Sequence, residues 1–222
     1  MYPLKRLTIL CGHYGSGKTN VAVNIATELK KTRDTVTVAD LDIVNPYFRT
    51  KDSAAYFEEQ GIRLICSAYA NSNVDIPALP QEMYALTDDR SMHAVLDIGG
   101  DDRGALVLGR LAPKILAEGD YEMLMVINCY RPLTRTPEEA LEVMREIEAA
   151  CSLKFTDIIN NSNLGCETTA DLVLDSFDYV DKLSEISGLP LWMHTVRADL
   201  VQQLHGCGRH IFPLYLQQKF FY

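Results

Sequence analysis

Short apolar runs alternate along the chain with segments of helical periodicity. Seven runs are rich in Val, Ile, Leu and Met and show little alternation of polar and apolar positions, which is typical of strands that helices cover on both faces. They lie at residues 7–11, 35–39, 63–66, 94–98, 123–129, 156–160 and 191–194. The pattern predicts seven buried strands.

Two of the intervening segments carry clear helix signals. After Lys18, the residues Val21, Ile25 and Leu29 recur on one face of a predicted helix. The segment 136–151 begins with Thr136, Pro137 and Glu139. A threonine cap, a first-turn proline and a glutamate at the third position predict a capping box. Its inner stripe is Leu141, Met144, Ile147 and Cys151.

Alternation of strands and helices over the whole length predicts a doubly wound α/β fold with a mainly parallel sheet of about seven strands. The chain has 222 residues, of which 47% are hydrophobic, and this suits one domain spanning 1–222. Residues 71–80 are the most irregular and are expected to form a surface loop.

Charge and composition narrow the possible partners. The formal net charge is −9, and Lys and Arg are scattered, so neither nucleic acid nor a membrane is an expected partner. No apolar stretch is long enough for a membrane span or a signal peptide, and the expected location is cytoplasmic. Six cysteines form no Cys-x-x-Cys pair, which favours reduced thiols.

The strongest motif follows the first strand. Gly12-His13-Tyr14-Gly15-Ser16-Gly17-Lys18-Thr19 matches the Walker A pattern, between an apolar strand and an amphipathic helix. Glycines let backbone N–H groups wrap a phosphate chain, Lys18 reaches the β- and γ-phosphates, and Thr19 ligates Mg²⁺. A Rossmann dinucleotide loop would need glycine at position 20, where Asn20 stands. The residues from Gly12 to Asn20 are therefore expected to bind ATP and Mg²⁺.

Acidic residues follow two further strands. Asp40 and Asp42 come after the second strand, and Asp97 ends the fourth, with Gly100 completing an Asp-x-x-Gly pattern. Carboxylates at these strand ends face the crevice in which such sheets bind ligands. One of Asp40 and Asp42 can hold Mg²⁺ through water while the other orients an attacking water. Asp97 has the Walker B position, and the Gly100 N–H could sense a γ-phosphate.

These three motifs occur in the order seen in the MinD/ParA-like deviant-Walker P-loop ATPases, which the chain resembles over nearly its whole length. The resemblance implies a seven-stranded sheet, an ATP-dependent homodimer, and a switch that acts on a protein partner. It also implies that Asp42 orients the hydrolytic water. One position departs from the family pattern, because its signature lysine is replaced here by His13. A histidine carries only partial charge at neutral pH, so His13 is either a weak substitute or a loop residue without a catalytic role.

Asparagines end the sixth strand. In the resembling family an asparagine at this point binds adenine, and Asn161 matches that position. Related GTPases read guanine with Asn-Lys-x-Asp, and no Asp follows Asn161 at that spacing, which favours ATP over GTP. The alternative is that these asparagines only form a turn.

Three other segments leave alternatives open. Arg131 and Arg135 could contact phosphate or a partner, but pairing with surface carboxylates is favoured. The spacing from His205 to His210 fits no zinc pattern. The aromatic tail from residue 211 could meet a partner or a membrane, but docking on the protein itself is favoured.

The sequence therefore predicts a Mg-ATP-binding P-loop protein, with Lys18, Asp42 and Asp40 as catalytic candidates and Thr19, Asp42 and Asp97 around the metal. A slow ATPase acting as a switch is the first hypothesis. The alternatives are an ATP-dependent ligase resembling dethiobiotin synthetase or cobyrinic acid amide synthase, and an ATP sensor that does not hydrolyse its nucleotide.

Overall fold

The computed structural model describes residues 4–41, 54–66, 81–99 and 102–216. Its centre is one eight-stranded sheet in the order β3-β2-β4-β1-β5-β6-β7-β8, and each pair of neighbouring strands is parallel. The strands are β1 (Leu7–Cys11), β2 (Val36–Leu41), β3 (Arg63–Cys66), β4 (His93–Ile98), β5 (Tyr121–Ile127), β6 (Asp157–Asn160), β7 (Leu191–Arg197) and β8 (Ile211–Leu214).

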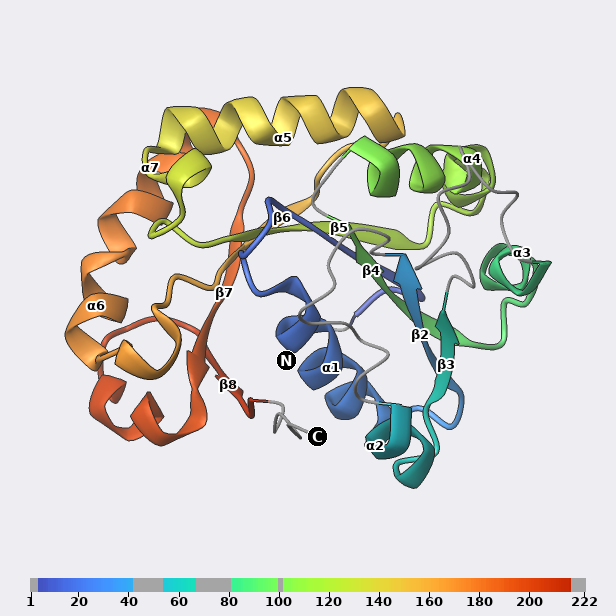
Figure 1. Cartoon of the computed structure of the whole chain (residues 1–222), viewed down its shortest axis with the longest axis horizontal. Coiled ribbons are helices and arrows are strands. Elements are labelled where there is room, and N and C mark those ends of the chain that lie inside the picture. The colour runs from blue at the N-terminus through green and yellow to red at the C-terminus, as the bar shows by residue number, and fades with distance from the viewer. Residues whose placement is uncertain (1–3, 42–53, 67–80, 100–101, 217–222) are drawn as a thin grey trace, which may run out of the picture.

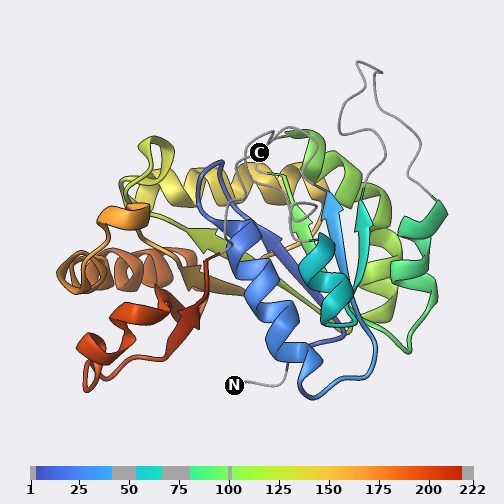
Figure 2. The same cartoon turned by 60° about the horizontal axis from the view of Figure 1, so that its bottom comes forward.

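Helices cover both faces of the sheet (Figures 1 and 2). One face packs against α3 (Gln81–Asp88), α4 (Asp102–Glu118), α5 (Pro137–Cys151) and α7 (Phe177–Ser187), and the other packs against α1 (Lys18–Lys30) and α2 (Ala54–Glu59). The short helix α6 (Ala170–Asp175) and the 3₁₀ turns at Pro132–Thr134, Gly165–Glu167 and Ala198–Leu204 complete the described elements. This is the predicted doubly wound α/β fold.

All seven predicted strands are present, with ends shifted by a few residues, and β8 is an addition. The segment from residue 211 was expected to dock on the protein, and residues Ile211–Leu214 do so as an edge strand beside β7. The sequence did not predict this strand, because Pro213 has no N–H to donate to the hydrogen bonds between strands. At the edge of a sheet one side of the strand needs no partner, so Pro213 is tolerated there.

The two helices with clear sequence signals are confirmed. In α5 the Thr136 side chain accepts a hydrogen bond from the Glu139 N–H, and the Glu139 side chain accepts one from the Thr136 N–H. Met144 and Cys151 are buried in the core under α5. In α1 the expected stripe, Val21, Ile25 and Leu29, is buried against the other face of the sheet.

Parallel strands all end at one edge of the sheet, so the described segments after β1, β5, β6, β7 and β8 lie on the same side of the molecule. The P-loop after β1 occupies the middle of this edge, because β1 lies between β4 and β5. Three predictions, namely Asp42, Gly100 and the loop at residues 71–80, fall outside the described residues.

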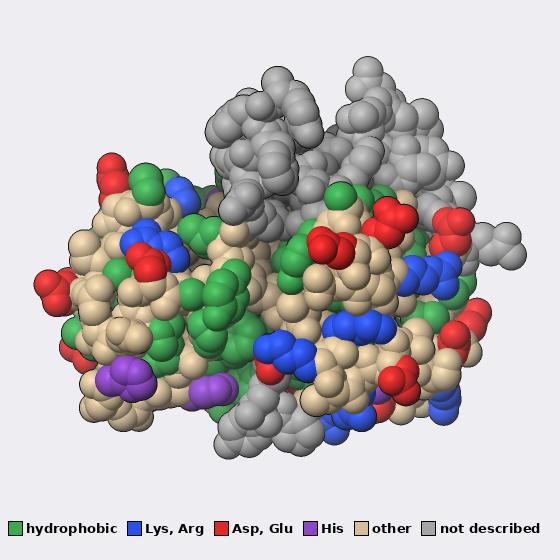
Figure 3. Space-filling view, turned by 90° about the horizontal axis from the view of Figure 1, so that it is seen from below, with side chains coloured by type: hydrophobic (Ala, Val, Ile, Leu, Met, Phe, Trp, Pro, Cys, Tyr) green, Lys and Arg blue, Asp and Glu red, His purple; other side chains and the backbone are tan. Residues whose placement is uncertain are grey.

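The face that carries α1 and β8 shows hydrophobic side chains in its middle, with acidic and basic side chains intermixed around them (Figure 3). Tyr215 and Leu216, which follow β8, are among the exposed hydrophobic residues, with 71% and 48% of their surface accessible. Within the described part of the chain, no helix has the length and apolar character needed to cross a membrane.

Candidate functional site: a phosphate loop and an adjoining pocket

The P-loop runs from the end of β1 into α1, and two of its glycines are required by close approaches. Gly12 has φ 151°, and a Cβ there would lie 2.3 Å from the carbonyl oxygen of Val126 on β5. Gly17 has φ 87°, and its Cβ would lie 2.2 Å from Nδ2 of Asn161. Real Cβ atoms do not come so close to other heavy atoms, so only glycine fits this backbone path.

Helix α1 begins directly at this loop without a side-chain cap. Its cap residue is Gly17, which has no side chain to accept a hydrogen bond from the first turn. The first N–H groups of a helix have no partners within the helix, and they carry the positive end of its dipole. An uncapped N-terminus that follows a glycine loop is suited to bind an anion such as phosphate.

Lys18 lies inside the loop rather than on the surface. It is 5% exposed, and its Nζ donates to the carbonyl oxygens of Gly12 at 2.9 Å and His13 at 3.3 Å. Ser16 is also buried, and its Oγ has no hydrogen-bond partner among the described residues. A phosphate in the loop would give the ammonium a counter-charge and the Ser16 hydroxyl an acceptor. The residues therefore fit a phosphate group.

Thr19 and Asp97 meet as the motifs predicted. The Thr19 hydroxyl donates to Oδ2 of Asp97 at 2.7 Å, and both residues are buried. Asp40 on β2 is buried beside them, because its Cα is paired in register with that of Asp97 on β4. A hydroxyl with a carboxylate is a donor set that Mg²⁺ uses together with nucleotide phosphates. The residues therefore fit a magnesium ion as well.

Cys11 is the last residue of β1, immediately before the loop. Burial is the main cause that raises the pKa of its thiol well above the ordinary value, and Cys151 and Asp97 raise it further, against the opposing effect of Lys18. A neutral thiol is a poor nucleophile. We therefore assign Cys11 to the core beneath the loop and not to the chemistry of the site.

Asn161 is tied to the P-loop by its side-chain amide. Its Nδ2 donates to the Ser16 carbonyl at 2.6 Å, and its Oδ1 accepts from the Thr195 hydroxyl at 2.7 Å. The side chain therefore links the loop after β6 to the phosphate loop and to β7. It also lies on the wall of the adjoining pocket, so its predicted contact with the base stays a prediction. Thr195 was not predicted as a residue of the site. Its place directly after the predicted strand at residues 191–194 was the signal that could have identified it.

A pocket of about 650 Å³ opens beside the P-loop, toward the ends of β6, β7 and β8. Its volume falls in the usual range of small-molecule sites. Part of its wall is apolar, from Val173, Val196, Leu214 and Leu216, and part is polar, from the asparagines and threonines after β6 and β7. The full lining is Tyr14, Gly15, Gly17, Lys18, Thr19, Asn20, Arg131, Asn161, Ser162, Asn163, Gly165, Cys166, Thr168, Val173, Thr195, Val196, Arg197, Leu214 and Leu216.

The two arginines after β5 differ in their surroundings. Arg131 lines the pocket, and its Nε donates to the Gly15 carbonyl at 3.0 Å. It contacts the phosphate loop, so the favoured pairing with a surface carboxylate is not what the structure shows. Arg135 is exposed. In the loop itself, Nδ1 of His13 lies 3.0 Å from the carbonyl oxygen of Tyr14, whose own side chain is 53% exposed.

Buried polar side chains support the loop after β6 from below. Asn160 Nδ2 lies 2.8 Å from the Ser176 hydroxyl and 3.0 Å from Nδ1 of His194, and Asn160 Oδ1 accepts from the Ser162 N–H and hydroxyl. His194 is 1% exposed, and burial lowers its pKa to about 4. The ring is therefore neutral at pH 7, with Nδ1 as the acceptor for Asn160. This network fixes one side of the pocket.

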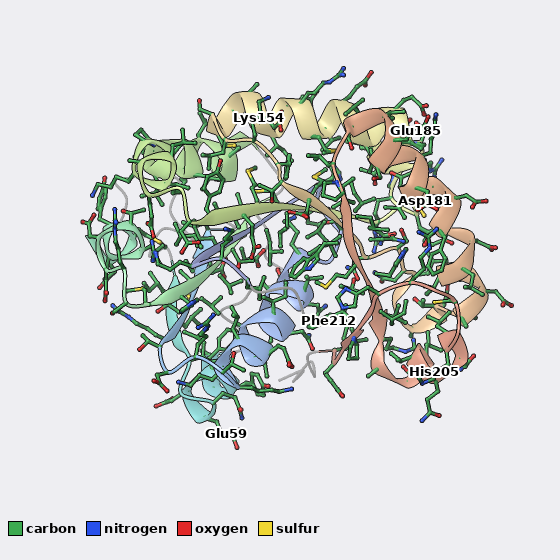
Figure 4. All side chains as sticks on the ribbon, turned by 180° about the vertical axis from the view of Figure 1, so that it is seen from behind. Glu59, Lys154, Asp181, Glu185, His205 and Phe212 are labelled. Atoms are coloured by element: carbon green, nitrogen blue, oxygen red, sulfur yellow. The ribbon has the colours of Figure 1, made fainter. Side chains whose placement is uncertain are left out.

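The histidine segment from His205 to His210 precedes β8. His205 follows the 3₁₀ turn at Ala198–Leu204, and Arg209 of this segment pairs with Asp181 on α7, the helix that also carries Glu185 (Figure 4). Across the described residues, no three His, Cys, Asp or Glu side chains gather into a group that could hold a metal ion unaided. A magnesium ion at the P-loop would need phosphate oxygens as well as Thr19 and Asp97.

Fold and loop together define the class: this chain has the α/β fold of the P-loop NTPases. It is similar to cell division protein FtsY from Thermotoga maritima, with a TM-score of 0.57 and 18% identity over 87% of this chain and 62% of that one. It is also similar to FtsY from Mycoplasma mycoides, with a TM-score of 0.53 and 17% identity over 87% of this chain and 60% of that one.

A third similar structure is signal recognition particle receptor FtsY from Elizabethkingia anophelis in complex with GDP, with a TM-score of 0.50 and 14% identity over 88% of this chain and 58% of that one. This chain thus spans about three fifths of the lengths of the proteins it matches. No protein-family model and no curated protein matches the sequence. At such low identity the likeness establishes the fold, and it does not select the MinD/ParA-like family within that fold.

Proposed function

We propose that this protein binds a magnesium nucleoside triphosphate, favours ATP, and uses slow hydrolysis to switch its interaction with a protein partner. One observation carries the proposal: the Thr19 hydroxyl lies 2.7 Å from the Asp97 carboxylate, next to the buried Lys18 ammonium. Lys18 and Thr19 both lie at the uncapped start of α1, where backbone N–H groups favour an anion. The Walker A and Walker B residues are thus brought together although 78 positions separate them.

Each polar residue of the site has its own proposed role in binding the nucleotide and the metal ion. Lys18 would exchange the carbonyls of Gly12 and His13 for oxygens of the β- and γ-phosphates. Thr19 would ligate Mg²⁺, and Asp97 would hold a water bound to the ion. When bound, the ion neutralises phosphate charge and strengthens the γ-phosphate as an electrophile. Asp42 is proposed to orient the attacking water, and Asp40, buried beside Asp97, is the next candidate.

The base is proposed to enter the pocket beyond the P-loop, where Val173, Val196, Leu214 and Leu216 supply an apolar wall. The aspartate with which Asn-Lys-x-Asp proteins read guanine is replaced by Leu164, which is 39% exposed. This replacement supports adenine. The similar structure from Elizabethkingia anophelis was solved with GDP, so the choice of base is a direct test of the proposal.

Calorimetric titration of the parent protein with ATP, GTP and ADP in the presence of Mg²⁺ tests these points. We expect ATP to bind more tightly than GTP. Lys18→Ala should weaken ATP binding at least about 100-fold, because a desolvated cation–phosphate pair is worth several kcal/mol. Lys30→Ala is the matched control on the same helix, since the Lys30 ammonium donates to the Asp34 carbonyl at the far end of α1. If a folded Lys18→Ala protein bound ATP as tightly as the parent does, the proposal would be wrong.

His13 supplies the observation that favours a second candidate, an ATP sensor. The ring is held by the adjacent Tyr14 carbonyl, and it replaces the lysine that the resembling family places opposite the phosphates of the second copy. Turnover and sedimentation should be measured with ATP and with ADP, for the parent and for His13→Lys. A switch dimerises with ATP and hydrolyses it, and His13→Lys should strengthen both properties. A sensor binds ATP as a monomer and turns over in neither form.

A further inference from the structure

The chain directly after β8 is fixed to the P-loop helix by one side chain. Asn24 on α1 accepts a hydrogen bond from the Tyr215 N–H at 2.9 Å and donates from Nδ2 to the Tyr215 carbonyl at 3.0 Å. This is what a neighbouring strand would do for the same residue, since paired residues exchange both backbone hydrogen bonds. The two positions are 191 residues apart. Asn24 therefore extends the pairing of the chain beyond the end of the sheet.

The Asn24 amide uses its full hydrogen-bonding capacity in two contacts. It is 8% exposed, and its Nδ2 also donates to the carbonyl of Asn20, one turn earlier on α1, at 2.8 Å. Both amide protons and the amide oxygen are thus in use. Removing this side chain would leave the N–H and C=O of Tyr215 without these partners, and a partly buried backbone group that loses its partner costs stability.

The two hydrogen bonds between Asn24 and Tyr215, called the clamp below, fix residues that face the pocket. Leu214 and Leu216, on either side of Tyr215, both line it, and so does Asn20. Because side chains alternate along an extended chain, Leu214 and Leu216 point to one side and Tyr215 to the other, which agrees with the 71% exposure of Tyr215. Phe212, labelled on β8 in Figure 4, lies in the core cluster shared with α1. Half of Leu216 is exposed and is available to a ligand.

We infer that residues 214–216 form a wall of the base pocket, and that Asn24 is the positioning residue that holds this wall against α1. The inference rests on the proposed function, because it assigns the apolar end of the pocket to the purine. Planar aromatic bases pack well on apolar side chains and gain little from a polar wall. Asn24 lies on the helix whose first turn carries Lys18 and Thr19, so the phosphate end and the base end of the site share one rigid element.

A purely structural role for Asn24 would have a different signature. If the clamp only anchors the chain, Asn24→Ala lowers the melting temperature and changes affinity for all ligands alike. If it positions the base wall, Asn24→Ala weakens binding of ATP and leaves binding of inorganic tripolyphosphate unchanged, since tripolyphosphate occupies only the P-loop. The ratio of the two affinities therefore separates the roles.

The experiment compares the parent, Asn24→Ala, Leu216→Ser and Thr27→Ala in Mg²⁺ with ATP and with tripolyphosphate. Thr27 is the matched control on α1, because its hydroxyl donates to the Val23 carbonyl and lies 3.3 Å from the Tyr56 hydroxyl. We expect Asn24→Ala and Leu216→Ser to weaken ATP binding about tenfold, since the base would lose part of its apolar contact with residues 214–216. Tripolyphosphate binding should stay within about twofold for all variants, because the P-loop contacts are kept.

Hydrogen exchange gives a second readout on the same proteins. ATP should slow exchange of the Tyr215 amide in the parent and in Thr27→Ala, whereas tripolyphosphate should not, and Asn24→Ala should lose this protection. Equal ATP affinity in the parent, Asn24→Ala and Leu216→Ser overturns the inference while the proposed function stands. A parent that binds neither ATP nor tripolyphosphate overturns both. Should Asn24→Ala fail to fold, Leu216→Ser decides alone, because Leu216 is at the surface.

Discussion

Helices α1 and α5 both begin at the carboxyl edge of the sheet, yet their first turns are finished in opposite ways. At α5, Thr136 and Glu139 close a complete capping box, with Pro137 at the first position. At α1, Gly17 is the cap residue, and it has no side chain that could accept from the first turn. One helix is capped by its own side chains, and the other begins with a glycine that cannot cap it.

This difference separates a structural helix end from a functional one. A cap that makes both reciprocal hydrogen bonds stabilises its helix by roughly 1 kcal/mol. The start of α1 forgoes that stabilisation and places Lys18, Thr19 and a glycine loop at the same point. Such a local loss is expected where the sequence serves binding rather than folding. An anion would complete α1 as the side chains of Thr136 and Glu139 complete α5.

The largest expected effect comes from blocking the open helix end. Gly17→Ala places a methyl group 2.2 Å from Nδ2 of Asn161 in a residue with φ 87°. The amide must then leave the Ser16 carbonyl, and the loop must move. We expect ATP affinity to fall at least about 30-fold, equivalent to roughly 2 kcal/mol, as measured by calorimetry. Gly188→Ala is the control, since φ is 72° there but no atom lies within 4 Å of the added methyl group. Equal affinities in the two variants would show that the tight contact is irrelevant to binding.

An intermediate effect should come from Arg131, which supports the open end from outside. Its Nε donates to the Gly15 carbonyl, and a hydrogen bond to a charged donor contributes about 1.5 kcal/mol, or roughly tenfold in affinity, when it is kept from water. Because Arg131 is half-buried, Arg131→Ala should weaken ATP binding by about three- to tenfold. Arg135→Ala, on the exposed side of the same loop, should bind as the parent does. A larger loss in Arg135→Ala than in Arg131→Ala would reverse the assignment.

The contrast between the two helices also shows what the sequence could predict. Both helices, the Walker A residues and the seven strands β1 to β7 depend on neighbours in the sequence, so periodicity and spacing were sufficient to find them. That Thr19 and Asp97 lie near each other was predicted because a known motif order supplied the long-range information, and the structure shows their direct hydrogen bond. The predictions for Asp42 and Gly100 lie outside the described residues and stay predictions.

The far end of the pocket was not predictable in the same way. Its walls come from the loops after β5, β6, β7 and β8, and contacts between single side chains and distant backbone hold them in place. Asn24 with Tyr215, Asn161 with Ser16 and Arg131 with Gly15 join positions more than 100 residues apart. No local pattern marks such pairs. Strand β8 was missed for a related reason, because Pro213 argues against a strand unless its place at the sheet edge is known.

The smallest expected effect concerns the closed helix end, and it tests whether that end is structural only. Thr136→Ala removes the acceptor for the Glu139 N–H, so the free energy of unfolding should fall by about 1 kcal/mol. Nucleotide affinity should not change, because α5 contributes no residue to the pocket lining. Urea denaturation and ATP titration should be run on the same samples, with Thr136→Ser as the control that keeps the cap hydroxyl. Thr136→Ser should match the parent in both measurements.

If Thr136→Ala instead weakens ATP binding by more than about threefold while its stability is unchanged, the start of α5 takes part in the site. The contrast drawn between the two helices would then be wrong, because both ends would serve the ligand.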